Sequence, residues 1–371
     1  MSNRRAVLGR IKSSGQMGRA EIARGLGLST QAVSNIIAEL EADGFLAAAG
    51  ARSAGRGLPA VQYRINPRGG FALGAEIRPD ALFAAIVDLD GEPVVTCRRK
   101  LADTAPPALA ARLLALRGDM LTRADIPVER LLGAGIVMPG PFGETGISGL
   151  GSDLDGWQAR DARALFTGAL DMQVEVSNDA NAAAMAERIG GVAQGVDHFA
   201  FLYFGAGLGL GLIDRGALVT GGFGNAGEIG HVPVATASGP QPLEALISRV
   251  SVQAHLGGDA PVTVTSLDRL YRAGDRALMA WLDQASAALG QALAVIENLF
   301  DPQTIILGGA MPAVLLDHLV AETPLPTRSV ARRGDNPLPR LQRGASGRMT
   351  ATLGAAALAL NTAYTPHVAA L

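Results

Sequence analysis

Side chains that can take up protons or bind hydroxyl groups lie beside glycine-rich segments in the middle of this sequence. Asp179 follows a short apolar run and opens a small-residue pattern typical of a helix. A carboxylate at the end of a strand can accept a proton from an alcohol. An Asp before an apolar helix is more often a simple N-cap, so the local pattern alone favours that structural use.

Three further titratable residues follow within one stretch. Glu228 and His231 share the segment Gly-Glu-Ile-Gly-His, and Glu244 stands in Pro-Leu-Glu. Such groups around one cavity would replace the hydrogen bonds that a polar ligand loses when it leaves water. The structural alternatives are a hydrogen-bonded core histidine at His231 and a solvent-exposed helix face at Glu244. Cys97 is the only cysteine, so no disulfide framework or thiolate zinc cluster can form, and we expect no metal.

The pattern after residue 70 predicts an α/β scaffold for these residues. Nearly half of the 371 residues are apolar, which is enough for a sizeable core. Strand patterns alternate with helix patterns, which favours a two-lobed fold with mixed sheets. We expect strands over residues 71–77, 82–89, 132–138, 173–176, 199–204, 209–214 and 304–307, and helices over 107–123, 162–169, 179–189, 243–251, 266–273, 277–300 and 355–363.

The first 66 residues have a different pattern. Helices are expected over 6–13 and 19–26 and from Thr30 onward, where Ser29 is well placed as the N-cap. Strands over 45–49 and 60–65 would flank a loop over 50–59. This order predicts a winged helix-turn-helix, whose second motif helix enters the major groove of DNA. The side chains expected to contact DNA are Thr30, Gln31, Ser34 and Asn35 of that helix and Arg52 and Arg56 of the wing.

Charge is unevenly distributed between this head and the rest of the chain. Residues 1–66 hold nine Lys or Arg and four acidic residues, a formal charge of about +5, while the whole chain carries −2. The remainder is therefore at about −7. A basic head on an acidic body is what phosphate binding by the head alone requires.

The sequence also carries information on the cellular compartment of the protein. The N-terminus lacks the apolar core of a secretory signal, and no apolar stretch reaches the roughly 18 residues of a membrane span. Together with the single Cys97, these features favour a cytoplasmic protein without a membrane segment.

Five segments together resemble the ROK family, which unites sugar kinases with sugar-responsive repressors. They are residues 133–143, 177–187, 204–234, 242–248 and 301–311, in the family's order. The family's repressors also carry a winged helix-turn-helix in the same position. The resemblance implies an actin-like ATPase fold with a sugar cleft. We expect a DNA-binding domain over 1–66, a first lobe over 71–180 with the 350–371 helix packed on it, and a second lobe over 181–349.

The same resemblance implies roles for individual residues. In the kinases, the Asp equivalent to Asp179 is the general base on the sugar hydroxyl, and Asn178 would bond a neighbouring hydroxyl. The residues equivalent to Glu228 and His231 bind sugar, and the His often serves as a zinc ligand. The expected sugar-binding set is Asp153, Asn178, Asp179, Glu228, His231 and Glu244, with Asp153 standing where many members have Asn.

The departures from the family pattern bear on catalysis. The zinc-binding members carry three cysteines between the Gly-His and the Leu-Glu, and this chain has none there, so packing must hold that loop. In the stretch 74–80, Glu76 replaces an Asp, and Arg78, Pro79 and Asp80 replace the Gly-Gly-Thr that wraps ATP phosphate. Proline offers no amide proton, and an Asp would repel phosphate. The second phosphate turn, Gly205-Ala206-Gly207, lacks the hydroxyl, which favours a plain strand-to-strand turn.

We therefore expect a non-enzymatic, sugar-responsive DNA-binding regulator, most simply a repressor. Its partners would be operator DNA and a sugar or sugar-phosphate effector, with no cofactor and no membrane. It would act as a homodimer or a dimer of dimers, matched to a palindromic operator. Two alternatives stay open: a sugar kinase that uses ATP, Mg²⁺ and Asp179, and a scaffold that represses without a ligand.

Overall fold

The computed structural model describes residues 2–52, 59–79, 81–140, 142, 154, 156–157, 160–205, 207–258, 262–345, 347 and 349–364. The chain divides into two compact units. The first comprises residues 1–139, 152–177 and 352–371, and the second comprises residues 140–151 and 178–351. Each unit is described by itself.

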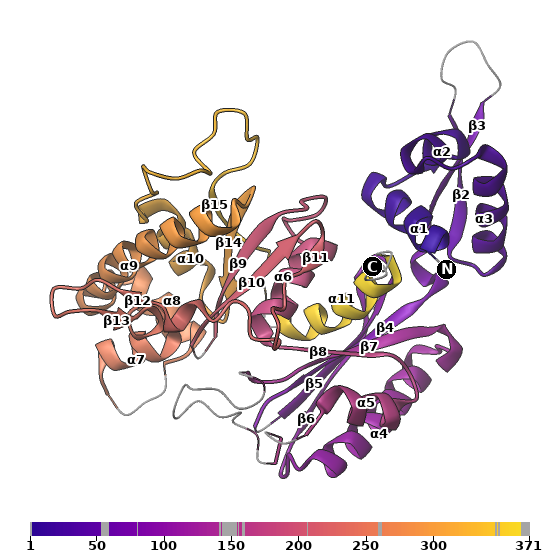
Figure 1. Ribbon diagram of the computed structural model, residues 1–371. Helices are drawn as coiled ribbons and strands as arrows, with labels where there is room; N and C mark the ends of the chain where they lie inside the picture. The colour runs from indigo at the N-terminus through magenta and orange to yellow at the C-terminus, as the bar shows by residue number, and fades with distance from the viewer. Residues whose placement is uncertain are drawn as a thin grey trace. The chain divides into compact units, whose positions relative to one another are not determined.

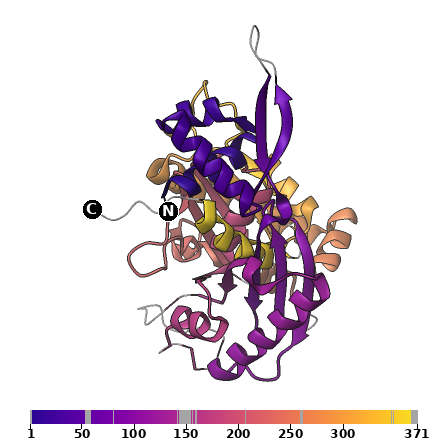
Figure 2. The same cartoon turned by 90° about the vertical axis from the view of Figure 1, so that its right-hand side faces the viewer.

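The first unit begins with a head of three helices and a three-stranded sheet (Figure 1). The sheet has the order β1-β3-β2, and the paired strands β2 and β3 extend beyond the helices (Figure 2). Val7, Ile11, Ile22, Val33 and Ile37 are fully buried and form the head's core. The elements are α1 (Ser2–Ser14), β1 (Met17–Gly18), α2 (Arg19–Leu26), α3 (Thr30–Ala42), β2 (Leu46–Arg52) and β3 (Ala60–Ile65).

The head keeps the expected helix-turn-helix order with two differences. The hydroxyl of Ser29 accepts a hydrogen bond from the amide of Ala32 at 3.2 Å, so the predicted N-cap of α3 is confirmed. β2 runs on to Arg52, which pairs with Ala60, so Arg52 belongs to a strand and not to the expected loop. The short strand β1, which the sequence did not predict, pairs with β3.

The rest of the first unit is a five-stranded sheet with the order β6-β5-β4-β7-β8. β4, β5 and β6 pair antiparallel, whereas β4, β7 and β8 pair parallel. Helices α4 and α5 lie across the sheet from α11 (Figure 1). The elements are η1 (Pro67–Gly69), β4 (Phe71–Ile77), β5 (Ala81–Asp88), β6 (Pro93–Lys100), α4 (Pro106–Ala124), η2 (Val128–Arg130), β7 (Leu131–Val137), α5 (Ala162–Leu170), β8 (Val174–Ser177) and α11 (Thr350–Tyr364).

Helix α11 lies unusually close to this sheet because two strand positions are glycine. A Cβ atom at Gly135 would overlap the carbonyl oxygen of Ala355, and one at Gly74 would overlap that of Thr352. The last described helix of the chain therefore packs directly on β4 and β7. Any larger residue at either glycine would force the helix away from the sheet.

The second unit repeats the same strand plan, with the order β11-β10-β9-β14-β15 and the same pattern of antiparallel and parallel pairs. Helix α6 packs on one face, where Gly209 and Gly211 leave room for Ala180. Alternate residues of β9 face a core built around Trp281 of α9 on the other side. The elements are α6 (Asp179–Gly190), β9 (Phe199–Phe204), β10 (Leu208–Asp214), β11 (Ala217–Leu218), η3 (Ile229–His231), β12 (Pro233–Val234), β13 (Gln241–Pro242), η4 (Leu243–Ala245), α7 (Arg249–Leu256), α8 (Val264–Arg272), α9 (Arg276–Phe300), β14 (Thr304–Gly309), α10 (Ala313–Glu322) and β15 (Leu341–Arg343).

The prediction of one continuous helix over 243–251 is wrong. The chain forms the short helix η4 and then restarts as α7 at Arg249. The restart has a local cause, since the Ser248 hydroxyl accepts a hydrogen bond from the amide of Ser251 and caps the new helix. Glu244 therefore lies on η4 and not within a long helix.

Candidate functional site

The structure shows which of Asn178 and Asp179 is the N-cap of helix α6. Asn178 is the N-cap of α6, because its Oδ1 accepts a hydrogen bond from the amide of Asn181 at 2.9 Å. The N-cap alternative for Asp179 is therefore wrong, and Asp179 is the first residue of the helix. Its Oδ1 accepts from the amide of Ala180 at 2.9 Å. A Cβ at Gly205 would lie 3.1 Å from its Oδ2, so the carboxylate lies against the β9–β10 turn.

Glu228, His231 and Glu244 form a second group in the same unit. His231 lies between the two carboxylates, with its Nε2 3.5 Å from Glu228 Oε2 and its Nδ1 3.6 Å from Glu244 Oε1. All three side chains are half-buried. The 3₁₀ helices η3 and η4 present them, and the backbone amide of Leu243 bonds the carbonyl of Val232 to join the two segments.

Glycines connect the two groups into one cluster. A Cβ at Gly207 would lie 2.6 Å from Glu244 Oε2, on the turn that Asp179 also contacts. Gly140 lies beside both Asn178 and Glu228, since its Cβ would be 3.8 Å from the first and 3.9 Å from the second. The structure thus brings five of the six expected sugar-binding residues together, namely Asn178, Asp179, Glu228, His231 and Glu244. Asp153, the sixth, lies outside the described residues.

Burial shifts the pKa of one carboxyl group of this cluster, that of Glu228. Desolvation raises the pKa of Glu228 above its ordinary value of 4.5; nearby His231 lowers it, and the Glu244 carboxylate raises it further. Removing a carboxylate from water costs free energy that the folded chain must supply elsewhere. A polar ligand whose hydroxyl groups bond Glu228 would supply part of it.

Asn225 is a site residue that the sequence reasoning missed. Its side-chain Oδ1 accepts from the amide of Phe142 at 2.8 Å, and its Nδ2 donates to the carbonyl of Phe142 at 2.9 Å. This two-way bond ties the segment after Gly140 to the segment that precedes Glu228. The only available signal was its place in the motif that contains Glu228 and His231.

The β4–β5 turn is filled by its own side chains. Glu76 is only 5% exposed, and its carboxylate accepts hydrogen bonds from Arg78 Nε at 2.6 Å and from the Thr352 hydroxyl at 2.8 Å. The Arg78 guanidinium also lies over the Phe83 ring at 4.6 Å. The Arg78 amide donates to the carbonyl of Ala81 at 2.9 Å. Asp80 lies outside the described residues.

The β9–β10 turn has the tight geometry that the sequence favoured. The Gly205 amide donates to the carbonyl of Gly207 at 3.0 Å, between the ends of β9 and β10. That donor is used within the turn itself. Such an amide cannot at the same time point at a phosphate oxygen.

The segment between His231 and Glu244 is held by hydrogen bonds and not by packing alone. β12 and β13 pair antiparallel, and the Gln291 side chain bonds both the amide and the carbonyl of Ala235 at 3.1 Å. In the part of the chain that the structure describes, no group of three or more His, Cys, Asp or Glu side chains has the geometry of a metal site.

The expected DNA-contacting residues of α3 lie on its first two turns. Thr30, Gln31 and Asn35 are exposed and Ser34 is half-buried, while Gln31 Nε2 donates to Asn35 Oδ1 at 3.0 Å. For Arg52 the structure describes the backbone only, and Arg56 lies outside the described residues.

The sequence profile of the ROK family matches residues 73–362, well over half of the chain. The chain belongs to the ROK family. The resemblance stated from the five motifs is confirmed, as is the fold class of a helix-turn-helix head and a two-lobed actin-like α/β body.

Similar proteins include both branches of the ROK family. The DNA-binding transcriptional repressor Mlc of Escherichia coli is 26% identical over 333 residues, covering 84% of this chain and 81% of Mlc. The xylose repressor of Bacillus subtilis is 23% identical over 318 residues, covering 82% of this chain and 81% of the repressor.

Two solved structures share the fold. A ROK family transcriptional regulator described as a homologue of the E. coli Mlc protein superposes with a TM-score of 0.74, 23% identity and coverage of 98% of this chain and 96% of its own. The ROK hexokinase of Thermus thermophilus gives a TM-score of 0.60 and 26% identity, covering 77% of this chain and 97% of the kinase. The ROK fold therefore serves both kinds of protein.

Within the described residues of this ROK protein, no helix is long and apolar enough to cross a membrane.

Proposed function

We propose that this ROK protein is a sugar-responsive, DNA-binding transcriptional repressor. The observation that carries the proposal is a helix-turn-helix head, with exposed polar residues on the first turns of α3, in one chain with a ROK body. Thr30, Gln31 and Asn35 present hydroxyl and amide groups that suit base edges in the major groove. The matches to the xylose repressor of B. subtilis and to Mlc of E. coli, which cover 82% and 84% of this chain, support the proposal.

The sugar site we propose is the cluster of Asn178, Asp179, Glu228, His231 and Glu244. Its carboxylate and amide oxygens accept hydrogen bonds from hydroxyl groups, which matches the chemistry of an uncharged sugar. Asp153 is added from its position before Gly156 and Trp157 in the sequence. A homodimer would present two heads to a palindromic operator.

We propose further that the protein transfers no phosphate. Asp179 retains the place of a general base, which is the observation in favour of a kinase. However, Glu76 and Arg78 fill the first phosphate turn and bond each other at 2.6 Å. A γ-phosphate there would have to displace an ion pair in which the Glu76 carboxylate is buried and the Arg78 side chain is 43% exposed, and it would leave the buried carboxylate without that partner.

The DNA-binding part of the proposal is tested in two steps. The full chain first selects operators from a random DNA library, and fluorescence anisotropy then measures its affinity for the selected operators. We expect affinity to fall steeply with salt and to drop when Gln31 or Asn35 is replaced by Ala. Glu41→Ala is the matched control, because Glu41 is exposed at the other end of α3. Binding that ignores both substitutions, or that does not depend on salt, would remove the DNA-binding function.

The sugar-sensing part of the proposal is tested by a thermal-shift screen of monosaccharides and sugar phosphates. A coupled ADP-release assay with ATP and Mg²⁺ then tests for kinase activity. A ligand of the folded state raises the melting temperature. We expect a hit that Asp179→Ala removes, and no ADP release above background. No hit would favour a ligand-free repressor, and turnover abolished by Asp179→Ala would establish the kinase instead.

A further inference from the structure

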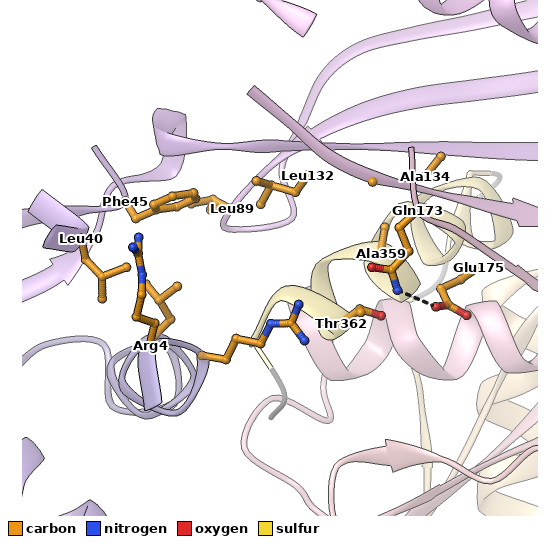
Figure 3. A pocket seen from close by; sticks show the side chains of 13 residues that line it. Arg4, Leu40, Phe45, Leu89, Leu132, Ala134, Gln173, Glu175, Ala359 and Thr362 are labelled. Atoms are coloured by element: carbon orange, nitrogen blue, oxygen red, sulfur yellow. Dashed lines mark hydrogen bonds between the residues drawn. The ribbon is translucent and has the colours of Figure 1, made fainter. Parts of the chain in front are cut away.

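The first unit contains a cavity of about 430 Å³ between the head and the first-lobe sheet. Its volume lies within the range of small-molecule sites in proteins. Figure 3 shows Phe45 of the head beside Leu89 and Leu132, with Arg4 across from them and Ala359 and Thr362 on α11. The five described candidate sugar-binding residues, Asn178, Asp179, Glu228, His231 and Glu244, belong to the second unit, so this cavity is a different place from that cluster.

The cavity is mostly apolar. Aliphatic and aromatic side chains from α1, α3, β7 and α11 and from the ends of neighbouring strands form its walls. They include Leu8, Leu40, Phe45, Leu89, Leu132 and Ala359. Such walls favour a ligand with an aromatic or branched aliphatic body.

One positive charge in the lining, that of Arg5, has no counter-ion in the part of the chain that the structure describes. Arg4 forms ion pairs with Glu39 and Asp43. Arg5 has no hydrogen bond and no ion pair among the described residues, although it is half-buried and lines the cavity. The free guanidinium therefore needs an anionic partner or water.

The one acidic residue of the lining is already neutralised. The Glu175 carboxylate lies 3.0 Å from Arg163 Nη2 and accepts a hydrogen bond from Gln173 Nε2 at 3.2 Å (Figure 3). The charged lining residues Arg4, Arg5 and Glu175 sum to a formal charge of +1, and Arg5 is the one of them with no ion pair among the described residues. A single unpaired guanidinium beside apolar walls matches a monoanion with an apolar body better than a neutral sugar.

We propose that this cavity is a binding site for a small amphiphilic monoanion, an aromatic or branched aliphatic carboxylate or sulfonate. Arg5 bonds the anionic group, and the leucines and Phe45 surround the apolar body. Because the lining comes from the head and from the first-lobe sheet, the ligand stabilises the head in its position on that sheet. The site does not rest on the proposed sugar or DNA functions.

The experiment uses the full-length protein and 8-anilinonaphthalene-1-sulfonate, an aromatic monoanion whose fluorescence rises in apolar sites. We expect saturable binding of one probe per chain. Arg5→Gln should weaken it about tenfold or more, the usual effect of losing a hydrogen bond to a charged group. Arg10→Gln is the matched control, since Arg10 is an exposed arginine on the same helix outside the cavity.

Two further measurements separate this site from general dye binding. Leu132→Trp places a larger side chain in the cavity and should abolish the saturable phase, with circular dichroism to confirm the fold. 1-Naphthoate should displace the probe at least tenfold better than neutral 1-naphthalenemethanol. Equal affinities for Arg5→Gln and Arg10→Gln, no saturable phase, or equal competition by the two naphthalenes would each overturn the proposal. Because neither DNA nor sugar is present, such a failure would leave the proposed function untouched.

Discussion

Replacing Glu228 by Gln should raise the stability of the ligand-free protein at pH 7.5 and lower its affinity for sugar. Burial is the main cause that raises the pKa of Glu228 above 4.5, so the folded chain takes up its proton more readily than the unfolded chain does. Stability linked to this group is therefore fully present below about pH 4.5 and falls as the pH rises through the raised folded-state pKa. At pH 7.5 the ionised carboxylate costs stability, and Gln removes that cost in nearly the same shape.

The expected affinity change has the opposite sign. A hydrogen bond from a sugar hydroxyl contributes about 1.5–3 kcal/mol when the acceptor is a charged carboxylate and about 0.5–1.5 kcal/mol when it is neutral, so Glu228→Gln should weaken sugar binding by about 1–1.5 kcal/mol, or roughly 5- to 12-fold. The assays are thermal melts of the ligand-free chain between pH 4 and 8, and calorimetric titration with the best sugar of the screen. Glu41→Gln is the control, because Glu41 is exposed on the head, far along the chain from this cluster.

Three outcomes are expected together. The variant melts above the wild type at pH 7.5, the difference closes as the pH falls towards 4.5, and the control shows neither effect. A variant that melts below the wild type at pH 7.5, by a margin that grows with pH, would mean that the ionised carboxylate stabilises the fold. The burial argument would then be refuted. Unchanged sugar affinity would remove Glu228 from the proposed site without touching the stability argument.

Three further predictions follow from single contacts. Ser29→Ala removes the N-cap of α3 and should cost about 0.5–2 kcal/mol of head stability in urea unfolding, with weaker DNA binding. Arg130→Ala removes bonds from Arg130 Nη1 to the carbonyls of Asp43 and Gly69, at 2.8 and 3.0 Å, and should speed amide hydrogen exchange around residues 66–70. Gly207→Val places a Cβ 2.6 Å from a Glu244 oxygen, so it should abolish sugar binding and leave affinity for operator DNA unchanged.

Much of the fold could be predicted because local signals at the ends of elements agree with the tertiary structure. α2, β3 and β9 begin and end where the sequence placed them, since glycines, turn residues and apolar runs mark their limits. β6 was missed because Arg98, Arg99 and Lys100 give it the composition of a solvated loop. Those charges are typical of an exposed edge strand, which is the position β6 occupies.

The candidate site was predictable in its residue types and not in its geometry. Asn178 and Asp179 are both common N-cap residues, so only the backbone of α6 decides that Asn178 caps the helix. The approach of Glu244 to Gly207 joins segments from two parts of the sequence and has no local signal. The hydrogen bond from Arg78 to Glu76 has no local sequence signal either. The sequence indicated only that Pro79 offers no amide proton to a phosphate.

The two turns β4–β5 and β9–β10 differ from the cluster around Glu228 in how their polar groups are used. A kinase must keep free donors at both turns, because phosphoryl transfer depends on positioning and charge stabilisation. Here Arg78 bonds Glu76, and the Gly205 amide bonds Gly207. The acceptors around Glu228 are half-buried, and burial raises the pKa of Glu228, so a ligand that bonds this carboxylate would offset part of its desolvation. A site that binds without chemistry can act on DNA only if the ligand prefers one conformation of the protein over another. The DNA-reading head belongs to the first unit and the cluster to the second, so that preference must pass between the two units.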